Sequence, residues 1–147
     1  MSGPTNTQFT VGLHALTLLA YLGPMSSETI ASSVGANAVY VRRVLGRLRE
    51  AGYVASRPGV HGGWELRRDP AELTLGDVWR LIAGPAPALL GVHHAHPACD
   101  AGQEIQATLE AIERRAARAV EAELDAIAVA DLTPDVAAQL PKHLRVA

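Results

Sequence analysis

Four side chains that can act as nucleophile, base or metal ligand lie within seven residues of each other: His93, His94, His96 and Cys99. A cysteine beside a histidine base is the arrangement of a covalent catalyst. Imidazole and thiolate are also good ligands for zinc and other transition metals. A thiol at the start of a helix can instead serve as an oxidation-sensitive switch.

Among the chemical roles open to these residues, the sequence favours the thiol switch over an enzyme and over a metal site. The sequence offers no Gly-rich phosphate loop, no candidate oxyanion hole and no carboxylate pair in a catalytic context, so we expect no enzyme. The spacing of the histidines and the cysteine matches no strong metal motif. Cys99 precedes a predicted helix whose dipole favours a thiolate, although Asp100 opposes it. A mixed His/Cys metal site and an inert hinge cysteine are the alternatives, and we expect no bound cofactor.

A second group of chemically active side chains is the run of arginines between residues 42 and 68. All seven arginines of residues 1–70 fall in that window, where two glutamates oppose them. A local excess of five positive charges is typical of a surface that binds a polyanion. Residues 71–147 are acidic, and the whole chain carries a formal net charge of −2. A solvated face balanced by the acidic half is the alternative.

The apolar periodicity places these arginines next to a helix-turn-helix, which is two short helices joined by a tight turn. The predicted helices cover residues 8–22, a short segment capped by Ser26 or Ser27 and ended by Gly35, and residues 38–51 capped by Asn37.

The predicted third helix has one apolar and one basic face. At 100° per residue, Val41, Val44, Leu45 and Leu48 form the stripe that packs inward. A helix in a DNA major groove needs donors for guanine edges and phosphates. A solvated surface helix, the alternative, usually mixes charge signs. The opposite face holds Val39, Arg42, Arg43, Gly46 and Glu50, flanked by Arg47 and Arg49.

A β-hairpin is predicted directly after this helix. Residues 53–56 and 64–67 read as strands, with a turn-rich tip between them and Arg57 at its base. A helix-turn-helix followed by a hairpin is a winged helix, whose wing brings a second basic element to DNA. A hairpin that only packs on the helices is the alternative. We therefore expect a mostly α fold with a small β-wing.

The C-terminal half is predicted to hold a dimerisation helix over residues 100–131. A capping box at Thr74–Asp77 opens a shorter helix before it. The long helix would reach roughly 45 Å, which exceeds what the small winged helix could cover. Its apolar seam would thus be exposed in a monomer, and packing on the chain's own first helix is the alternative. The seam repeats at 4-3-4-3 spacing and consists of Ile105, Leu109, Ile112, Ala116 and Ala119.

These elements divide the chain into four expected segments. They are the DNA-binding winged helix (8–83), a sensor or hinge loop (84–99), the dimerisation helix (100–131) and a C-terminal tail (132–147). The sequence shows no basic-then-apolar leader, a single cysteine and no apolar run near the ~18 residues of a membrane span. We therefore expect a cytoplasmic protein with no membrane partner.

Short motifs in a fixed order run from about residue 8 to about residue 130. They are His14-Ala15-Leu16, Ile30-Ala31-Ser32-Ser33, Val41-Arg42-Arg43-Val44-Leu45, Leu48, Ala51-Gly52-Tyr53-Val54, Ser56, Gly59, Gly62-Gly63, Leu66, Arg68, Pro70 and Thr74-Leu75-Gly76-Asp77-Val78. No single motif is diagnostic, but the ordered set resembles the Rrf-two family of bacterial transcription regulators.

The resemblance implies a homodimer whose two winged helices grip a roughly palindromic operator in double-stranded DNA. By position, it implies base contacts from Val39, Tyr40, Arg42 and Arg43, and wing contacts from Arg57, Pro58 and His61.

The resemblance also bears on Cys99. Family members with an iron–sulfur cluster place three cysteines in the loop before the long helix. Cys99 resembles the third of these, and His93 stands where a second ligand would lie. A three-cysteine cluster is therefore excluded within this chain. The stretch from His96 to Gly102 (His-Pro-x-Cys-x-x-Gly) is similar to that of members without a cluster.

We therefore expect a homodimeric, sequence-specific DNA-binding regulator, and a repressor rather than an activator, that responds to oxidation through Cys99. A chemical change in the loop would alter the distance between the two recognition helices and so the operator affinity. A winged helix used only for protein contact, and a metal-responsive regulator using residues 93–99, are the alternatives.

Overall fold

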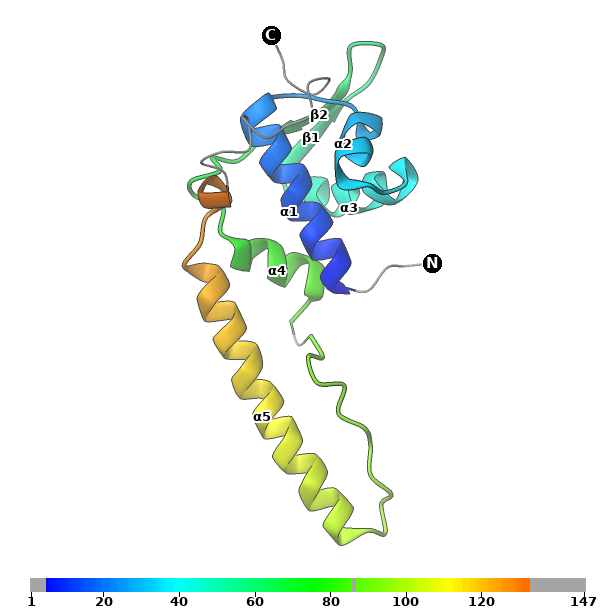
Figure 1. Cartoon of the computed structure of the whole chain (residues 1–147), viewed down its shortest axis with the longest axis vertical. Coiled ribbons are helices and arrows are strands. Elements are labelled where there is room, and N and C mark those ends of the chain that lie inside the picture. The colour runs from blue at the N-terminus through cyan, green and yellow to red at the C-terminus, as the bar shows by residue number, and fades with distance from the viewer. Residues whose placement is uncertain (1–4, 86, 133–147) are drawn as a thin grey trace.

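The computed structural model describes residues 5–85 and 87–132, and it is mostly helical with one two-stranded antiparallel sheet (Figure 1). The predicted winged helix followed by a long helix is confirmed. The predicted tail lies outside the described residues from residue 133 onward. The elements are α1 (Thr5–Leu22), α2 (Ser27–Val34), α3 (Ala38–Glu50), β1 (Val54–Arg57), β2 (Gly63–Leu66), α4 (Leu75–Ala83), α5 (Asp100–Asp125) and the 3-10 helix η1 (Val129–Leu132).

The predicted caps of α2 and α3 are confirmed. Ser26 Oγ accepts a hydrogen bond from the backbone N–H of Thr29 (3.1 Å), and Asn37 Oδ1 accepts one from that of Val39 (2.7 Å). Gly35 ends α2 with φ at 70°, a left-handed conformation that glycine adopts without a Cβ penalty. The two helices therefore meet at the tight turn that a helix-turn-helix requires.

The apolar stripe of α3 packs into the core, as predicted. Val41, Leu45 and Leu48 are fully buried, and Val44 is 1% exposed. They belong to one cluster with residues of α1, α2 and α4. Burying a side chain of this size contributes about 1.5–3 kcal/mol, so the rotation of α3 about its axis is strongly determined. The opposite face of the helix is left to solvent.

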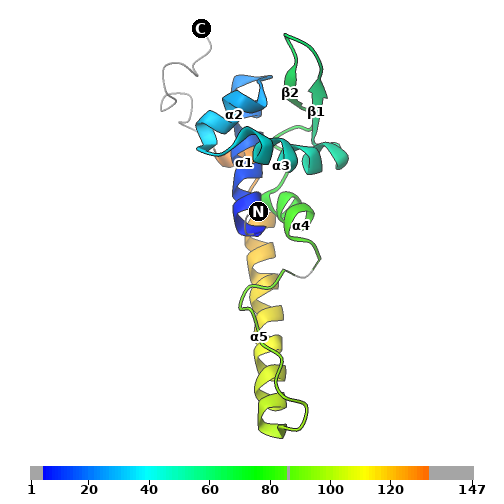
Figure 2. The same ribbon diagram turned by 90° about the vertical axis from the view of Figure 1, so that its right-hand side faces the viewer.

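The wing is a hairpin in which Val54 pairs with Leu66. Its first strand begins one residue later, and its second one residue earlier, than predicted. The backbone of Trp64 also exchanges two hydrogen bonds with Met25, which precedes α2 (2.8 and 3.1 Å). These bonds attach the wing to the helix-turn-helix, and Figure 2 shows the hairpin projecting beyond α3.

α5 ends at Asp125, before the predicted end of the dimerisation helix at residue 131. The chain turns there because Val129 is fully buried and packs into the core. The backbone N–H of Leu75, at the start of α4, donates to the carbonyl of Ile127 and holds the turn (2.9 Å). Helical periodicity could not reveal this end, because burial against a distant segment overrides local propensity.

α5 extends away from the winged helix as a stalk (Figures 1 and 2). Its 26 residues span about 39 Å at 1.5 Å each, and none of them is buried. Its C-terminal end is fixed to α4, where Arg80 donates two hydrogen bonds to the carboxylate of Asp125 (2.8 and 3.1 Å). Within the described ranges, no helix has both the length and the apolar content to cross a membrane.

α4 opens with the predicted capping box. Thr74 Oγ1 accepts a hydrogen bond from the N–H of Asp77 (3.0 Å), and Asp77 Oδ2 accepts one from the N–H of Thr74 (3.1 Å). Thr74→Ala is therefore expected to lower the free energy of unfolding by about 1 kcal/mol, as measured by urea denaturation.

The matched control is Thr10→Ala, because Thr10 is exposed on α1 and its hydroxyl bonds to the carbonyl of Thr7 in the same helix. This control should change stability by less than about 0.5 kcal/mol. Equal stability of the two variants would contradict the assigned cap.

Candidate functional site

The arginine-rich segment forms the exposed surface of α3 and the wing, far from the N-terminal end of α5 (Figure 1). Arg49 joins these two elements. Its guanidinium lies 5.7 Å from the ring centroid of Trp64, and its Nη1 is 3.4 Å from Ser56 Oγ. The basic face of α3 and the base of the wing are therefore held together as one unit.

The N-terminal half of α3 presents Val39, Arg42 and Arg43 to solvent. Val39 is 59% exposed, an unusual position for a large apolar side chain. Arg43 makes no ion pair or hydrogen bond with any described residue, so its donors are available. Tyr40 differs from its predicted role, because it packs against the core and its hydroxyl is buried, with no hydrogen-bond partner in the described part of the chain. The Tyr40 hydroxyl is therefore not presented on this face.

Arg47 is turned inward, in contrast to its prediction as a DNA contact. Its Nη1 donates to Gln8 Oε1 (3.1 Å) and its Nη2 donates to the carbonyl of Leu81 (2.9 Å). The side chain is half-buried and joins α3 to α1 and α4. The helical periodicity placed Arg47 beside the basic face, but it could not show which neighbouring helices cover that position.

Arg42 is paired with the first turn of α2. Its Nη1 lies 2.7 Å from Glu28 Oε1 and 3.1 Å from Ser27 Oγ. A hydrogen bond from the backbone of Glu28 itself, together with the one from Arg42, lowers the pKa of the Glu28 carboxyl. Sequence reasoning missed this partner, because fourteen residues separate the two side chains and no local pattern joins them.

The wing carries a comparable pair. Arg57 Nη2 lies 2.6 Å from Glu65 Oε2, and Arg67 Nε lies 3.3 Å from Glu65 Oε1. Glu65 is buried although it is charged, because the two arginines neutralise it. Pro58 and His61 are exposed at the tip, as a contact with DNA would require.

Cys99 caps the N-terminus of α5 and is exposed. Its Sγ accepts a hydrogen bond from the backbone N–H of Gly102 (3.3 Å), the interaction that the predicted position at a helix start implies. His96 Nδ1 accepts from the N–H of Ala98 (3.2 Å). No three His, Cys, Asp or Glu side chains in the described ranges converge on a metal-sized site. The structure thus brings Cys99 and the histidines into one loop but not into a ligand set.

The loop before α5 is attached to the side of that helix. Gln106 Oε1 accepts a hydrogen bond from the N–H of Ala95 (2.6 Å), and Glu113 Oε1 accepts one from the N–H of Leu90 (2.9 Å). Gln103 Nε2 donates to the carbonyl of Ala95 (3.2 Å). A chemical change at Cys99 would therefore act on a segment that is held against α5 over several turns.

The predicted dimerisation seam is solvent-exposed in the single chain. Ile105 is 57% exposed and Ile112 46% exposed; Ala119 is also exposed, whereas Leu109 and Ala116 are half-buried. Because the helix turns by 100° per residue, the three side chains that hold the loop lie away from this seam. They are Gln103, Gln106 and Glu113. The seam is therefore left open to a partner.

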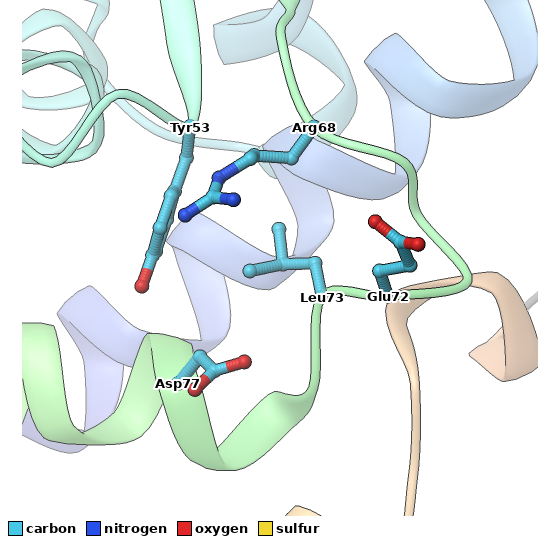
Figure 3. Close-up of a pocket in the computed structure, with 5 residues that line it drawn as sticks. All are labelled: Tyr53, Arg68, Glu72, Leu73 and Asp77. Atoms are coloured by element: carbon cyan, nitrogen blue, oxygen red, sulfur yellow. The ribbon is translucent and has the colours of Figure 1, made fainter.

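A small cavity of about 110 Å³ lies between the base of the wing and α4 (Figure 3). Arg68 lies 5.8 Å from the ring centroid of Tyr53, whose pKa is raised by burial and by Asp77. Burial alone would raise the pKa of Asp77, but its hydrogen bonds with Thr74 and Arg80 lower it. Typical ligand pockets measure roughly 300–1,000 Å³, so this cavity is a junction between elements rather than a binding site.

Comparison with known proteins shows which protein family this chain belongs to. The Rrf2 family model, described as "Iron-dependent Transcriptional regulator", matches residues 5–135. The chain belongs to the Rrf2 family, the Rrf-two family named above. It is accordingly a transcriptional regulator and not an enzyme.

Individual relatives agree with this assignment. YwnA of Bacillus subtilis is 36% identical over 128 residues, which cover 86% of this chain and 95% of YwnA. The crystal structure of Staphylococcus aureus CymR superposes with a TM-score of 0.64 at 27% identity and covers 87% of this chain and 96% of that one. T. potens IscR superposes with a TM-score of 0.63 at 26% identity and covers 92% and 90%.

The family description names iron, but the donor set of this chain does not fit a three-cysteine iron–sulfur centre. The sequence contains one cysteine, and the described histidines and carboxylates do not gather around it. One chain therefore cannot supply the three cysteines that such a centre needs.

Proposed function

We propose that this Rrf2-family regulator is a homodimeric repressor that binds a palindromic operator in the cytoplasm. Arg42, Arg43 and Val39 on α3 read bases in the major groove, and Arg57, Pro58 and His61 on the wing contact the backbone or minor groove. The observation that carries the proposal is the exposed basic face of α3, whose rotation is determined by the buried stripe on its other side.

The chemistry of these side chains suits a DNA groove. An arginine can donate two hydrogen bonds to the O6 and N7 of guanine, and an exposed valine can contact the methyl group of thymine. Arg43 is free of partners among the described residues, and Arg42 has Nε and Nη2 unengaged there. A purely protein-binding surface would not require this excess of positive charge.

Dimerisation is supported by the exposed seam of α5. A 26-residue helix without a buried residue is unusual in a monomer, because an amphipathic helix gains its stability from burying its apolar face. A second copy packed along Ile105, Leu109 and Ile112 would supply that burial. Two copies would also present two recognition helices, which suits an operator with two-fold symmetry.

The proposed signal is oxidation of Cys99. The thiol is exposed at a helix N-terminus, where an oxidant in solution can reach its sulfur. Peroxide would transfer one oxygen atom to the thiolate, giving a sulfenate and water. The enlarged, polar group would disturb the cap at Gly102 and the loop held against α5, and so the separation of the two winged helices.

DNA binding is tested by fluorescence anisotropy on a duplex that the wild-type protein selects from a random pool. Arg43→Ala should weaken binding to this site by about 1–3 kcal/mol and reduce sequence preference at one position. If Arg43 binds only phosphate, the salt slope falls by about 1 and the preference is unchanged. Unaltered affinity in both Arg42→Ala and Arg43→Ala would contradict the assigned face.

Dimerisation is tested by sedimentation equilibrium. Ile112→Glu places a charge in the seam and should give a monomer at concentrations where the wild type is dimeric. Ala107→Glu introduces the same charge at an exposed position on another side of α5 and should leave the dimer intact. A monomeric wild type, or a dimeric Ile112→Glu variant, would refute the proposed seam.

The thiol switch is tested by treating the DNA complex with mild peroxide and then with a reductant. The wild type should lose operator affinity and recover it on reduction. Cys99→Ser keeps a hydrogen-bond acceptor for the helix cap but lacks the thiol, so it should bind equally before and after treatment. If the serine variant loses affinity as the wild type does, or the wild type is indifferent to peroxide, Cys99 is not the sensor.

A further inference from the structure

The ion pair between Arg42 and Glu28 connects the two helices of the helix-turn-helix motif at the proposed recognition face. Arg42 Nη1 lies 2.7 Å from Glu28 Oε1, and Ser27 Oγ is 3.1 Å from the same nitrogen. Ser27 in turn donates to Glu28 Oε2 (3.2 Å). Each partner of the guanidinium is therefore itself held, and the three side chains form a closed network.

The anchor of this network is rigid. Ser27 is 5% exposed and stands at the first position of α2. The cap at Ser26 fixes the same turn of the helix through its hydrogen bond with Thr29. Arg42 thus receives its orientation from a buried, capped helix end, whereas the neighbouring Arg43 has no partner among the described residues to orient it.

The network accounts poorly for stability. The Arg42 and Glu28 side chains are 46% and 66% exposed, and exposed ion pairs contribute little to folding because solvent screens them. The network therefore acts mainly on DNA binding, through the orientation of Arg42 and the charge of Glu28 at the surface.

We infer that Glu28 is a positioning residue for sequence discrimination, acting through Arg42; the inference rests on the proposed function. Glu28 holds one nitrogen of Arg42, which leaves Nε and Nη2 without a described partner and available for two parallel hydrogen bonds to a base. A pre-oriented guanidinium loses less conformational freedom when it binds the correct base.

The charge of Glu28 acts in the same direction. A carboxylate beside the recognition helix repels phosphates in any register, which weakens binding to unrelated DNA. By holding Nη1 it also keeps Arg42 from pairing fully with a phosphate on unrelated DNA, while Nε and Nη2 remain available to the correct base. Discrimination therefore gains from the orientation of Arg42 and from the penalty on wrong sites.

The test compares the wild type with Glu28→Ala and Glu28→Gln, using the wild-type-selected duplex and a scrambled duplex of equal length. Glu28→Ala should bind the scrambled duplex more tightly, with a salt slope steeper by about 1, and should lower the ratio of the two affinities roughly tenfold. Glu28→Gln keeps a hydrogen-bond acceptor for Arg42, so it should lower the ratio less. Equal thermal unfolding of the variants checks that the fold is retained.

Two controls separate positioning from bulk charge. Glu50→Ala removes the same charge from the exposed C-terminal end of α3, where no described arginine pairs with it. It should strengthen binding to both duplexes alike and leave the affinity ratio within twofold of the wild type. In an Arg42→Ala background, Glu28→Ala should no longer change base preference, because the residue it positions is absent.

These experiments can contradict the role of Glu28 without contradicting the proposed function. A wild type that selects no sequence overturns the proposed function, and the inference with it. A wild type that selects a site which Glu28→Ala discriminates equally well overturns the inference alone. The inference is likewise overturned, with the proposed function intact, if Glu50→Ala lowers the ratio as much as Glu28→Ala.

Discussion

The burial of one face of α3 is the constraint on which the rest of the structure depends. Val41, Leu45 and Leu48 are fully buried, so the helix cannot rotate without exposing them or leaving a cavity, which costs about 2–5 kcal/mol for a single large side chain. Because the helix repeats every 3.6 residues, fixing these positions also fixes Arg42 and Arg43 on the opposite face. The basic surface is thus a consequence of the core, and the ion pair with Glu28 only refines the direction of one side chain.

The environment of α5, the stalk, is the opposite of that of α3. α5 has an amphipathic sequence but no buried residue, so its apolar seam is exposed in the single chain. Its base is firmly set by Arg80, Asp125 and the burial of Val129. A displacement at the far end, where Cys99 caps the helix, would therefore be carried along a rigid element toward the winged helices. In the proposed dimer, a second copy packed along α5 would determine the position of this helix relative to the winged helices.

The features predictable from sequence are those that local chemistry determines. Caps at Ser26, Asn37 and Thr74, the inward stripe of α3 and the hairpin follow from side-chain type and spacing over a few residues. Four features were not predictable from the sequence. They are the inward turn of Arg47, the buried hydroxyl of Tyr40, the pairing of Arg42 with Glu28 and the end of α5 at Asp125. Each depends on a contact with an element distant in sequence, which periodicity does not encode.

The measurement that tests this account most directly is a hydroxyl-radical footprint of the reduced protein on its selected DNA. We predict two protected half-sites related by two-fold symmetry, with centres separated by whole helical turns of about 10–10.5 base pairs each. Such a pattern is expected of a two-fold symmetric dimer that presents two basic reading faces. A single asymmetric protected region, or uniform protection that follows no sequence, would contradict it.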